Sequence, residues 1–396
     1  MISADPRALR APIRTPLTLG AALSTALLAS ACGDDPEAPG KATELPSPLV
    51  ITADWLHGTL SYASLSGLEG TQTHAEAVVS TLDLSKYVPG PLTLEFTPDR
   101  KKLLVATSSG FFAIGGAGGL LINEPNIPSG PGKFLMVDVD AQEVEHELDT
   151  GEGPNGIAVT PDGKRAFVAH FGSGNMAVVD LETFQIVQNL DIGIYAEEVV
   201  LDETGTVGVV GYSDDGSVRT FGVADPAGTL SPQVKLVGDS AGIAFFPGTK
   251  TAFVVQAPNP LGILSGSASS GHTLLDVTNP AAPVVLEDVR EPAIVGAYPA
   301  VVAANRGTVI VPAAQDGNFG VREYALENNK AVLKQEVPAG SAQFLGALGF
   351  AYDGKDTVVM AVPGQRAVIV TNLDTKQSRS IDWEQDEAGP ADVVIR

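Results

Sequence analysis

Residues 153–193 read GPNGIAVTPDGKRAFVAHFGSGNMAVVDLETFQIVQNLDIG and contain four short runs rich in β-branched and apolar residues. The runs are IAV, RAFVAH, GNMAVVD and FQIVQNLDI. Residues 161–164, Pro-Asp-Gly-Lys, separate the first two runs, and Asp-Gly between two such runs is a strong hairpin signal. The stretch therefore predicts an antiparallel sheet of four short strands.

Similar units recur along the chain. Runs that match the first strand of this unit lie near residues 92, 156, 197, 241, 299 and 347. Runs that match its third strand lie at 134–140, 272–278, 319–326 and 367–374. The first strands are spaced by 41 residues at the closest and 64 at the widest, against ~40–50 residues in a usual propeller blade. Repetition of a four-stranded unit predicts an all-β fold, a β-propeller.

The two ends of the repeat region complement each other. Residues 389–396, GPADVVIR, resemble the opening GPNGIAV of residues 153–159, but the chain stops there. Residues 49–54, LVITAD, begin the repeat region without a preceding first strand. We therefore expect a single seven-bladed propeller over residues 49–396, closed by the C-terminal strand pairing into the first blade, which hides the sheet edges. The alternative is that the last residues form a plain apolar tail.

The unit at 153–193 also carries a specific resemblance. Its PDGKR turn, its second-strand end FVAH and its third strand ending in Val-Asp are similar to the YVTN-type propeller repeat. The match spans one complete blade, and the other copies are looser. The resemblance implies a β-propeller and no particular activity.

The N-terminus is typical of an exported protein. Arg7, Arg10 and Arg14 precede an uncharged run over residues 17–31, which is too short to cross a membrane as an ordinary helix. The run ends Ala-Ser-Ala before Cys32, which resembles the bacterial lipobox. The resemblance implies a signal peptide over residues 1–31 and lipidation of Cys32; the alternative is an ordinary secretory signal.

Residues 32–48 are polar and rich in Pro, Asp and Glu, so we expect a disordered tether between the lipid and the domain. Gly33 follows the cysteine, whereas an Asp at that position favours inner-membrane retention in enteric lipoproteins. The protein is therefore expected at the outer membrane or cell surface. Cys32 is the only cysteine, which excludes an internal disulfide and a CxxCH haem site.

The charge of the chain restricts its partners. The formal net charge is −23, and removing residues 1–31, which carry +2, leaves −25. Such a surface repels nucleic acid and anionic lipid, so attachment to a membrane needs the lipid anchor. We expect a monomeric domain with no nucleic-acid partner.

Two long insertions are candidate binding surfaces. Residues 108–133 and 257–271 both fall between a second and a third strand, so they are expected on the same face of the ring. We predict a surface for an envelope protein or a small molecule; the alternative is that these side chains plug the channel mouth or pair as an extra hairpin. The candidate binding residues are Phe111, Phe112, Leu120, Leu121, Ile122, Leu261, Ile263 and Leu264.

A few polar residues are weaker candidates. His170 ends a second strand on the same face and could act as a ligand or a base, or it could be bonded to backbone. Glu197 and Glu198 follow a blade connector and could reach the channel mouth with a metal or catalytic role. No HExxH and no complete calcium loop is present.

The sequence thus favours a non-enzymatic binding or scaffold module on the cell envelope, without a cofactor motif. The alternative is an enzyme of the propeller hydrolase or lactonase type, with a divalent cation in the central channel. Because one fold serves many functions, the fold itself does not decide between them.

Overall fold

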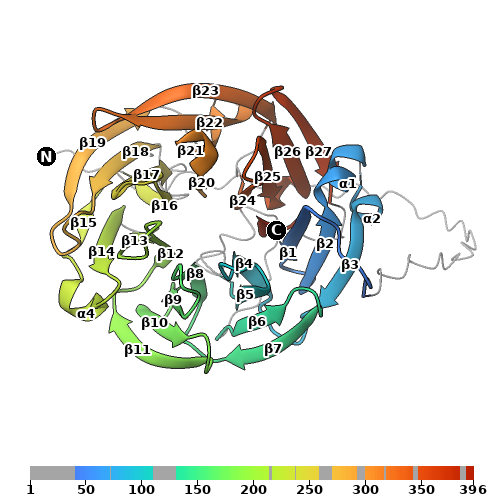
Figure 1. The fold of residues 1–396 in the computed structure, drawn as a ribbon, viewed down its shortest axis with the longest axis horizontal. Coiled ribbons are helices and arrows are strands. Elements are labelled where there is room, and N and C mark those ends of the chain that lie inside the picture. The colour runs from blue at the N-terminus through green and yellow to red at the C-terminus, as the bar shows by residue number, and fades with distance from the viewer. Residues whose placement is uncertain are drawn as a thin grey trace, which may run out of the picture. The chain divides into compact units, whose positions relative to one another are not determined.

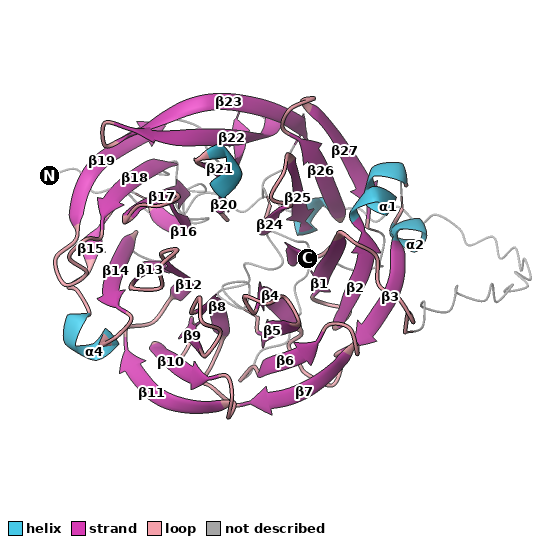
Figure 2. Ribbon diagram, in the orientation of Figure 1, coloured by secondary structure: helices cyan, strands magenta, loops and turns pink. Residues whose placement is uncertain are grey.

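The protein is a seven-bladed β-propeller in the computed structural model, with each blade a four-stranded antiparallel sheet (Figure 1). The structure describes residues 41–71, 73–109, 131–213, 216–236, 238–257, 270–291, 299–315, 318–341, 347–383 and 389–396. The blades are numbered here by chain order, with the closing blade last. Figure 2 shows that strands dominate the described residues, beside a few short helices.

Blades 1 to 3 follow one another along the chain. Blade 1 contains β4 (Pro91–Phe96), β5 (Lys102–Thr107), β6 (Phe134–Asp138) and β7 (Glu143–Leu148). Blade 2 contains β8 (Pro154–Val159), β9 (Arg165–His170), β10 (Asn175–Asp180) and β11 (Gln185–Asp191). Blade 3 contains β12 (Ala196–Leu201), β13 (Val207–Tyr212), β14 (Ser217–Gly222), the short helix α4 (Pro226–Thr229) and β15 (Val234–Lys235).

Blades 4 to 6 repeat the same order. Blade 4 contains β16 (Asp239–Phe245), β17 (Thr251–Ala257), β18 (Ser270–Asp276) and β19 (Val284–Glu291). Blade 5 contains β20 (Val301–Ala303), β21 (Thr308–Gln315), β22 (Asn318–Glu327) and β23 (Lys330–Ser341). Blade 6 contains β24 (Gly349–Tyr352), β25 (Thr357–Val362), β26 (Ala367–Asn372) and β27 (Gln377–Asp382).

Blade 7 joins the two ends of the repeat region, as the sequence predicts. It contains β28 (Asp392–Ile395), β1 (Leu49–Asp54), β2 (Thr59–Ser64), the helices α1 (Leu65–Gly70) and α2 (His74–Ala77), and β3 (Val78–Asp83). β28 pairs antiparallel with β1, in a register that sets Ile395 opposite Val50 and Asp392 opposite Ala53. The C-terminus therefore lies at the inner side of the ring (Figure 1), and the expected closure is confirmed.

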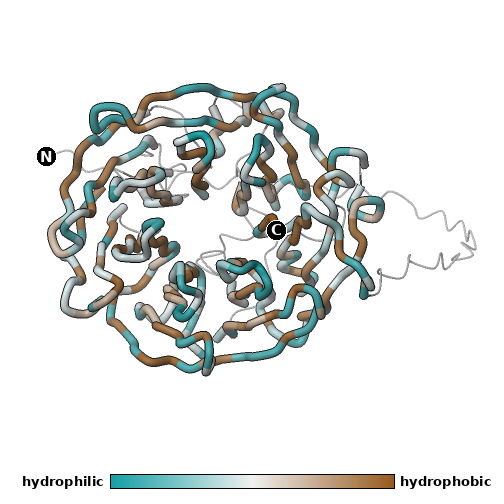
Figure 3. Tube along the Cα trace, in the orientation of Figure 1, coloured by the Kyte–Doolittle hydropathy of each residue, from teal (hydrophilic) through white to brown (hydrophobic). Residues whose placement is uncertain are grey.

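The core lies between the blades. Many of the apolar residues lie within the strands of the blades (Figure 3). Buried side chains of neighbouring sheets pack on one another. Phe167 of β9 and Phe221 of β14 meet with ring centroids 5.2 Å apart, across the interface of blades 2 and 3. The outermost strands carry many exposed residues, as β7 and β11 do, because one face of each remains in solvent.

A buried polar network fastens blade 7 to blade 6. Asp54, at the end of β1, accepts hydrogen bonds from Ser61 Oγ, from Thr52 Oγ1 at 3.0 Å and from Trp383 Nε1 at 2.9 Å. His74 Nε2 lies 3.1 Å from Ser61 Oγ, and its ring meets that of Trp383 edge-on at 4.6 Å. Because Trp383 follows β27 of blade 6, the network spans the junction at which the ring closes.

The segment before β1 contacts the propeller. Within the expected tether, the Ala42 backbone N–H donates to Ser80 Oγ at 3.1 Å, and the Ala42 carbonyl accepts from Gln142 Nε2 at 2.8 Å. Leu45 packs against the core between blades 7 and 1. Residues 1–40 lie outside the described part of the chain. Among the described residues, no helix is long and apolar enough to cross a membrane.

The strand order fixes two ends of the central channel. The connectors between blades and the loops from second to third strands leave from one end, here called the connector end. The turns from first to second strands lie at the other, here called the turn end. Both predicted insertions run from a second to a third strand, from β5 to β6 and from β17 to β18, so they start and finish at the connector end.

Candidate functional site

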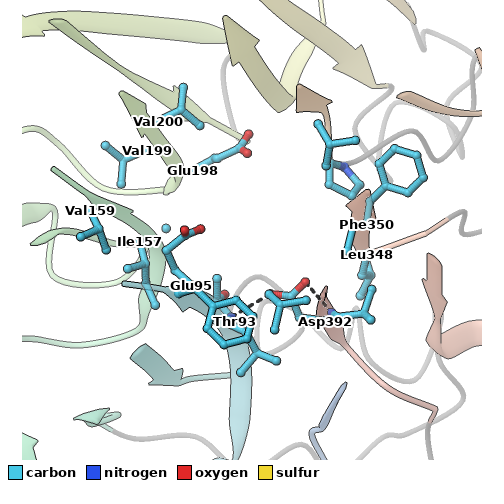
Figure 4. Close-up of a pocket in the computed structure, with 18 of the residues that line it drawn as sticks. Thr93, Glu95, Ile157, Val159, Glu198, Val199, Val200, Leu348, Phe350 and Asp392 are labelled. Atoms are coloured by element: carbon cyan, nitrogen blue, oxygen red, sulfur yellow. Dashed lines mark hydrogen bonds between the residues drawn. The ribbon is translucent and has the colours of Figure 1, made fainter. Parts of the chain in front are cut away.

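A cavity of about 570 Å³ lies in the central channel, lined by the first strands of six blades. Its walls come from β4, β8, β12, β20, β24 and β28. The volume falls in the range of small-molecule sites, ~300–1,000 Å³. Figure 4 shows the side chains that surround it, including Glu95, Glu198 and Asp392.

The depth of each acidic residue follows from strand register. Glu198 and Asp392 each lie three residues before the end of their strands, β12 and β28, so they stand at equivalent depths. Glu95 lies one residue before the end of β4, two residues nearer the turn end. Because side chains alternate along a strand, residues two apart share a face. The three carboxyls therefore project in the same sense, and Figure 4 shows them around the cavity.

Glu197 reaches the same region through a local irregularity. The register between β12 and β13 shifts between Ala196 and Glu198, so that an extra residue is accommodated in β12. The backbone carbonyl of Glu197 accepts a hydrogen bond from Asn155 Nδ2 of β8 at 3.0 Å. Asn155 is only 8% exposed, and it holds β8 and β12 together at the cavity wall.

Two glycines allow the strands that carry the carboxyls to approach their neighbours closely. A Cβ atom on Gly156 of β8 would lie 2.6 Å from the backbone nitrogen of Val199 in β12. A Cβ atom on Gly349 of β24 would lie 2.4 Å from the Cα atom of Asp392 in β28. Real contacts do not reach these distances, so only glycine fits at both positions.

Burial raises the pKa values of these carboxyls. It raises the pKa of Glu95 to about 8, with a further increase from the charge of Asp392 and a decrease from Arg100. Burial raises the pKa of Asp392 to about 7, although the Leu94 and Val393 backbone N–H groups donate to its carboxylate at 2.7 and 2.8 Å. All four carboxyls are half-buried, because the surface left to them opens into the cavity.

The adjacent pair behaves in the same way. Burial raises the pKa of Glu197 to about 7, opposed by a hydrogen bond from Ser213. Burial also raises the pKa of Glu198 well above its usual value, and the charge of Glu197 adds to this. The cavity therefore holds carboxyls that exchange protons near neutral pH.

Several acceptor atoms at the site have no hydrogen-bond donor among the described residues. They are Glu197 Oε2, Glu198 Oε2 and Asn155 Oδ1. A buried acceptor without a donor costs about 1–3 kcal/mol, so these atoms favour a ligand that brings N–H or O–H groups.

The rest of the wall is largely apolar, with one basic group. Val159, Val200 and Leu348 line the cavity and are half-buried (Figure 4). Arg100 lies at the turn end, where its Nη1 donates to the carbonyl of Ile395 at 3.1 Å. The site thus offers acidic and apolar surface side by side.

The described residues contain no group of three or more His, Cys, Asp or Glu side chains placed to hold a metal ion. The cavity carboxyls come from three strands, and only Glu198 and Asp392 stand at the same depth. Within that part of the chain, the divalent-ion centre of the alternative sequence interpretation is therefore not assembled.

The predicted site residues fall into three groups. Glu197 and Glu198 line the cavity, as their place after a connector suggested. Cys32 and all eight apolar insertion residues lie outside the described residues. His170 is fully buried, and burial lowers its pKa to about 4. Its Nδ1 lies 2.9 Å from the Asn175 carbonyl and its Nε2 lies 2.7 Å from Thr150 Oγ1, so neither ring nitrogen is open to a ligand.

Sequence reasoning missed Glu95, Asp392 and Asn155. A signal for the first was present, because Glu95 interrupts an apolar first strand where blades 2 and 3 have Ala158 and Val200. Asp392 interrupts the closing strand in the same way. A carboxyl inside a predicted innermost strand must face the channel or a blade interface, and the channel is where water and ligands reach it.

The network of Asp54, Ser61 and His74 contains the residue types of a hydrolytic triad but not its arrangement. Ser61 directs its hydroxyl hydrogen to Asp54, so the hydroxyl oxygen is left to accept from His74. A nucleophilic serine needs the histidine as its proton acceptor. Ser61 is also fully buried, and the cluster therefore has a structural role.

Comparisons with known proteins support the fold and no more. No family model matches the chain, and no curated protein matches it by sequence. A functionally unknown protein from Desulfotomaculum acetoxidans is similar in structure, with 15% identity, a TM-score of 0.64, and coverage of 87% of this chain and 98% of that one. Kuenenia stuttgartiensis hydrazine synthase gives 17% identity, a TM-score of 0.55, and coverage of 72% and 77%.

A third similar structure is the dihydro-heme d1 dehydrogenase NirN in complex with DHE, at 12% identity, a TM-score of 0.52, and coverage of 91% and 82%. At these identities the likeness establishes a shared propeller architecture, and the activities of these proteins do not carry over.

Proposed function

We propose that the protein is an exported, lipid-anchored binding module of the cell envelope, whose ligand site is the central cavity of the propeller. The single observation that carries the binding role is the cavity of about 570 Å³, whose walls include buried acceptor atoms without donors. The export and anchor rest on the arginines, the apolar run and Cys32 of the N-terminal sequence. The outer membrane or cell surface is the proposed location.

The insertion face has a secondary place in this proposal. Both insertions leave from the connector end of the channel, next to the strand ends that carry Asn155 and Glu197. We propose that their apolar residues form the contact surface for an envelope partner around the entrance to the cavity.

Hydrolysis is the second candidate, and the raised pKa values of the cavity carboxyls favour it. A carboxyl with a pKa of about 7, as burial gives Glu197, can donate or accept a proton near neutral pH. Binding is preferred because the described residues assemble neither a metal centre nor a serine with a histidine base.

The proposal is tested by filling the cavity. Thr93 of β4 lies on the same face as Glu95 and is half-buried at the wall, so Thr93→Trp occupies ligand space. Val187 of the outer strand β11 is 60% exposed, and Val187→Trp is the matched control. The full-length chain in detergent is screened by thermal shift and native mass spectrometry against charged and neutral small molecules.

We expect compounds that stabilise the wild type and Val187→Trp but not Thr93→Trp. A second cavity-filling variant, Val200→Trp in β12, keeps the test valid if Thr93→Trp does not fold. Compounds that bind equally well to both filled variants would place the ligand site elsewhere and overturn the proposal. Turnover of a lactone or ester panel, abolished in the filled variants, would establish the hydrolase instead.

A further inference from the structure

We propose that the cavity binds a small organic cation, an alkylammonium ion whose N–H groups bond to the unpartnered acceptors of Glu197, Glu198 and Asn155 and whose carbon chain lies on the apolar wall. This inference rests on the proposed function and specifies the class of its ligand. It follows from three properties of the site, which are its charge, its set of acceptors and its shape.

The charge of the cavity selects a cation. Four carboxyls, those of Glu95, Glu197, Glu198 and Asp392, line it, against one guanidinium, that of Arg100. The chain adds a formal net charge of −23, whose field draws cations towards the molecule and repels anions. An anionic or phosphorylated ligand would have to approach like charges.

The unpartnered atoms select a hydrogen-bond donor. Glu197 Oε2, Glu198 Oε2 and Asn155 Oδ1 are all acceptors without donors among the described residues. Asn155 cannot turn to supply the missing donor, because its Nδ2 is engaged by the Glu197 carbonyl. An ammonium group carries three donors and no acceptor, which matches this set. Hydrogen bonds between charged partners are also the stronger kind.

The shape and the walls select an organic ion over a bare metal ion. A volume of about 570 Å³ corresponds to roughly 19 waters at about 30 Å³ each, far more space than one metal ion fills. The described residues group no three metal-binding side chains together. Val159, Val200 and Leu348 offer the cavity half-buried apolar surface, which a carbon chain covers and a hydrated metal ion does not.

Binding is expected to be linked to protons. The titratable groups that line the cavity are Glu95, Glu197, Glu198, Asp392, Arg100 and Tyr352. Tyr352 bonds through its hydroxyl to Asn305 Oδ1 and to the Lys355 carbonyl. The carboxyls have raised pKa values, so some are protonated at neutral pH, and a bound cation favours their ionised forms. Affinity for a cation should therefore rise up to tenfold per pH unit for each proton released.

The test is calorimetric titration of the full-length chain in detergent. The probes are alkylammonium ions of one to six carbons and 1,4-diaminobutane, with butanol, butyrate, Mg²⁺ and Ca²⁺ for comparison. We expect binding of ammonium probes, no binding of butyrate, and affinity that increases from pH 6 to pH 8.5. Glu198→Gln should weaken binding at least tenfold, whereas Glu182→Gln, an exposed residue between β10 and β11, should leave it unchanged.

The outcomes separate the two proposals. Binding of butanol or butyrate but of no ammonium probe, lost in Thr93→Trp, would overturn the cation inference and keep the cavity as the site. Tight binding of Mg²⁺ or Ca²⁺ that excludes the ammonium probes would also overturn it. If neither these probes nor the wider compound panel bind the wild type, both proposals fail.

Discussion

The closing strand should hold a large share of the stability of the whole ring. Val393 and Ile395 of β28 are 1% and 6% exposed and pack in the cluster between blades 6 and 7. Deleting residues 389–396 removes both side chains, each worth about 1.5–3 kcal/mol of burial. It also removes backbone hydrogen bonds, such as those between Leu49 and Arg396 at 2.9 and 2.7 Å and that from Ala391 to Ala53 at 2.8 Å.

The apolar loss alone is thus about 3–6 kcal/mol, and the deletion also exposes the edge of β1 to solvent. Because domains are stable by about 5–15 kcal/mol, the truncated chain should lose cooperative unfolding or aggregate. A milder variant, Ile395→Ala, should cost about 2–5 kcal/mol. Val187→Ala on the exposed side of β11 is the control and should change stability by less than about 0.5 kcal/mol.

Guanidinium unfolding followed by tryptophan fluorescence is a suitable assay. The chain has two tryptophans, and both Trp55 after β1 and Trp383 after β27 are 1% exposed beside the closing blade. An unchanged unfolding midpoint after deletion of residues 389–396 would refute ring closure by β28.

Three further predictions concern pH, the network at the ring junction and the anchor. The folded pKa of Glu95 is about 8 and those of Glu197 and Asp392 are about 7, so the folded state binds the extra protons. The free energy of unfolding should therefore rise by about 3–4 kcal/mol from pH 8.5 to 6.5. Below pH 6.5, His170, whose pKa is about 4 in the fold, opposes this gain; a urea midpoint that falls between pH 8.5 and 6.5 would contradict the assignment. Asp54→Ala strands the donors of Ser61, Thr52 and Trp383 and should cost about 3 kcal/mol or more in urea unfolding, while Glu182→Ala should be neutral. Cys32→Ser should release the protein from membranes on fractionation, and retention in the detergent phase would rule out the lipid anchor.

The propeller architecture could be predicted from the sequence because the turn and strand patterns that indicate it are local and repeated. Each Asp-Gly or similar turn between apolar runs marks a hairpin, and six first strands with a matching C-terminal remnant define a ring of seven blades. The turn at Asp162 shows why the local signal is reliable, since its carboxylate accepts from Thr160 Oγ1 at 2.6 Å and from the Lys164 backbone N–H at 3.1 Å. These bonds fix the turn without help from distant parts of the chain.

The site could be predicted from the sequence only in part, because its residues are far apart in the sequence and meet only in the fold. Glu197 and Glu198 drew attention as an acidic pair after a connector, but Glu95 and Asp392 are almost 300 residues apart in sequence and come together only when the ring closes. The hydrogen bond from the Leu94 backbone N–H to Asp392 at 2.7 Å joins blade 1 to blade 7 in this way. For His170 the sequence left two interpretations open, a ligand or base and a histidine bonded to backbone. In the structure its Nδ1 lies 2.9 Å from the Asn175 carbonyl and its Nε2 lies 2.7 Å from Thr150 Oγ1.

We propose that the acidic cavity in the channel exchanges protons for a cationic ligand. The most direct measurement is the number of protons released when 1,4-diaminobutane binds the full-length chain at pH 7, obtained by calorimetry in buffers of different ionisation enthalpy. The diamine is already protonated at that pH, as amines with pKa values near that of lysine, about 10.4, are. We predict release of about one proton for each ligand bound, reduced in Glu95→Gln, whose carboxyl has the pKa of about 8. Binding without proton release, or with proton uptake, would contradict the account.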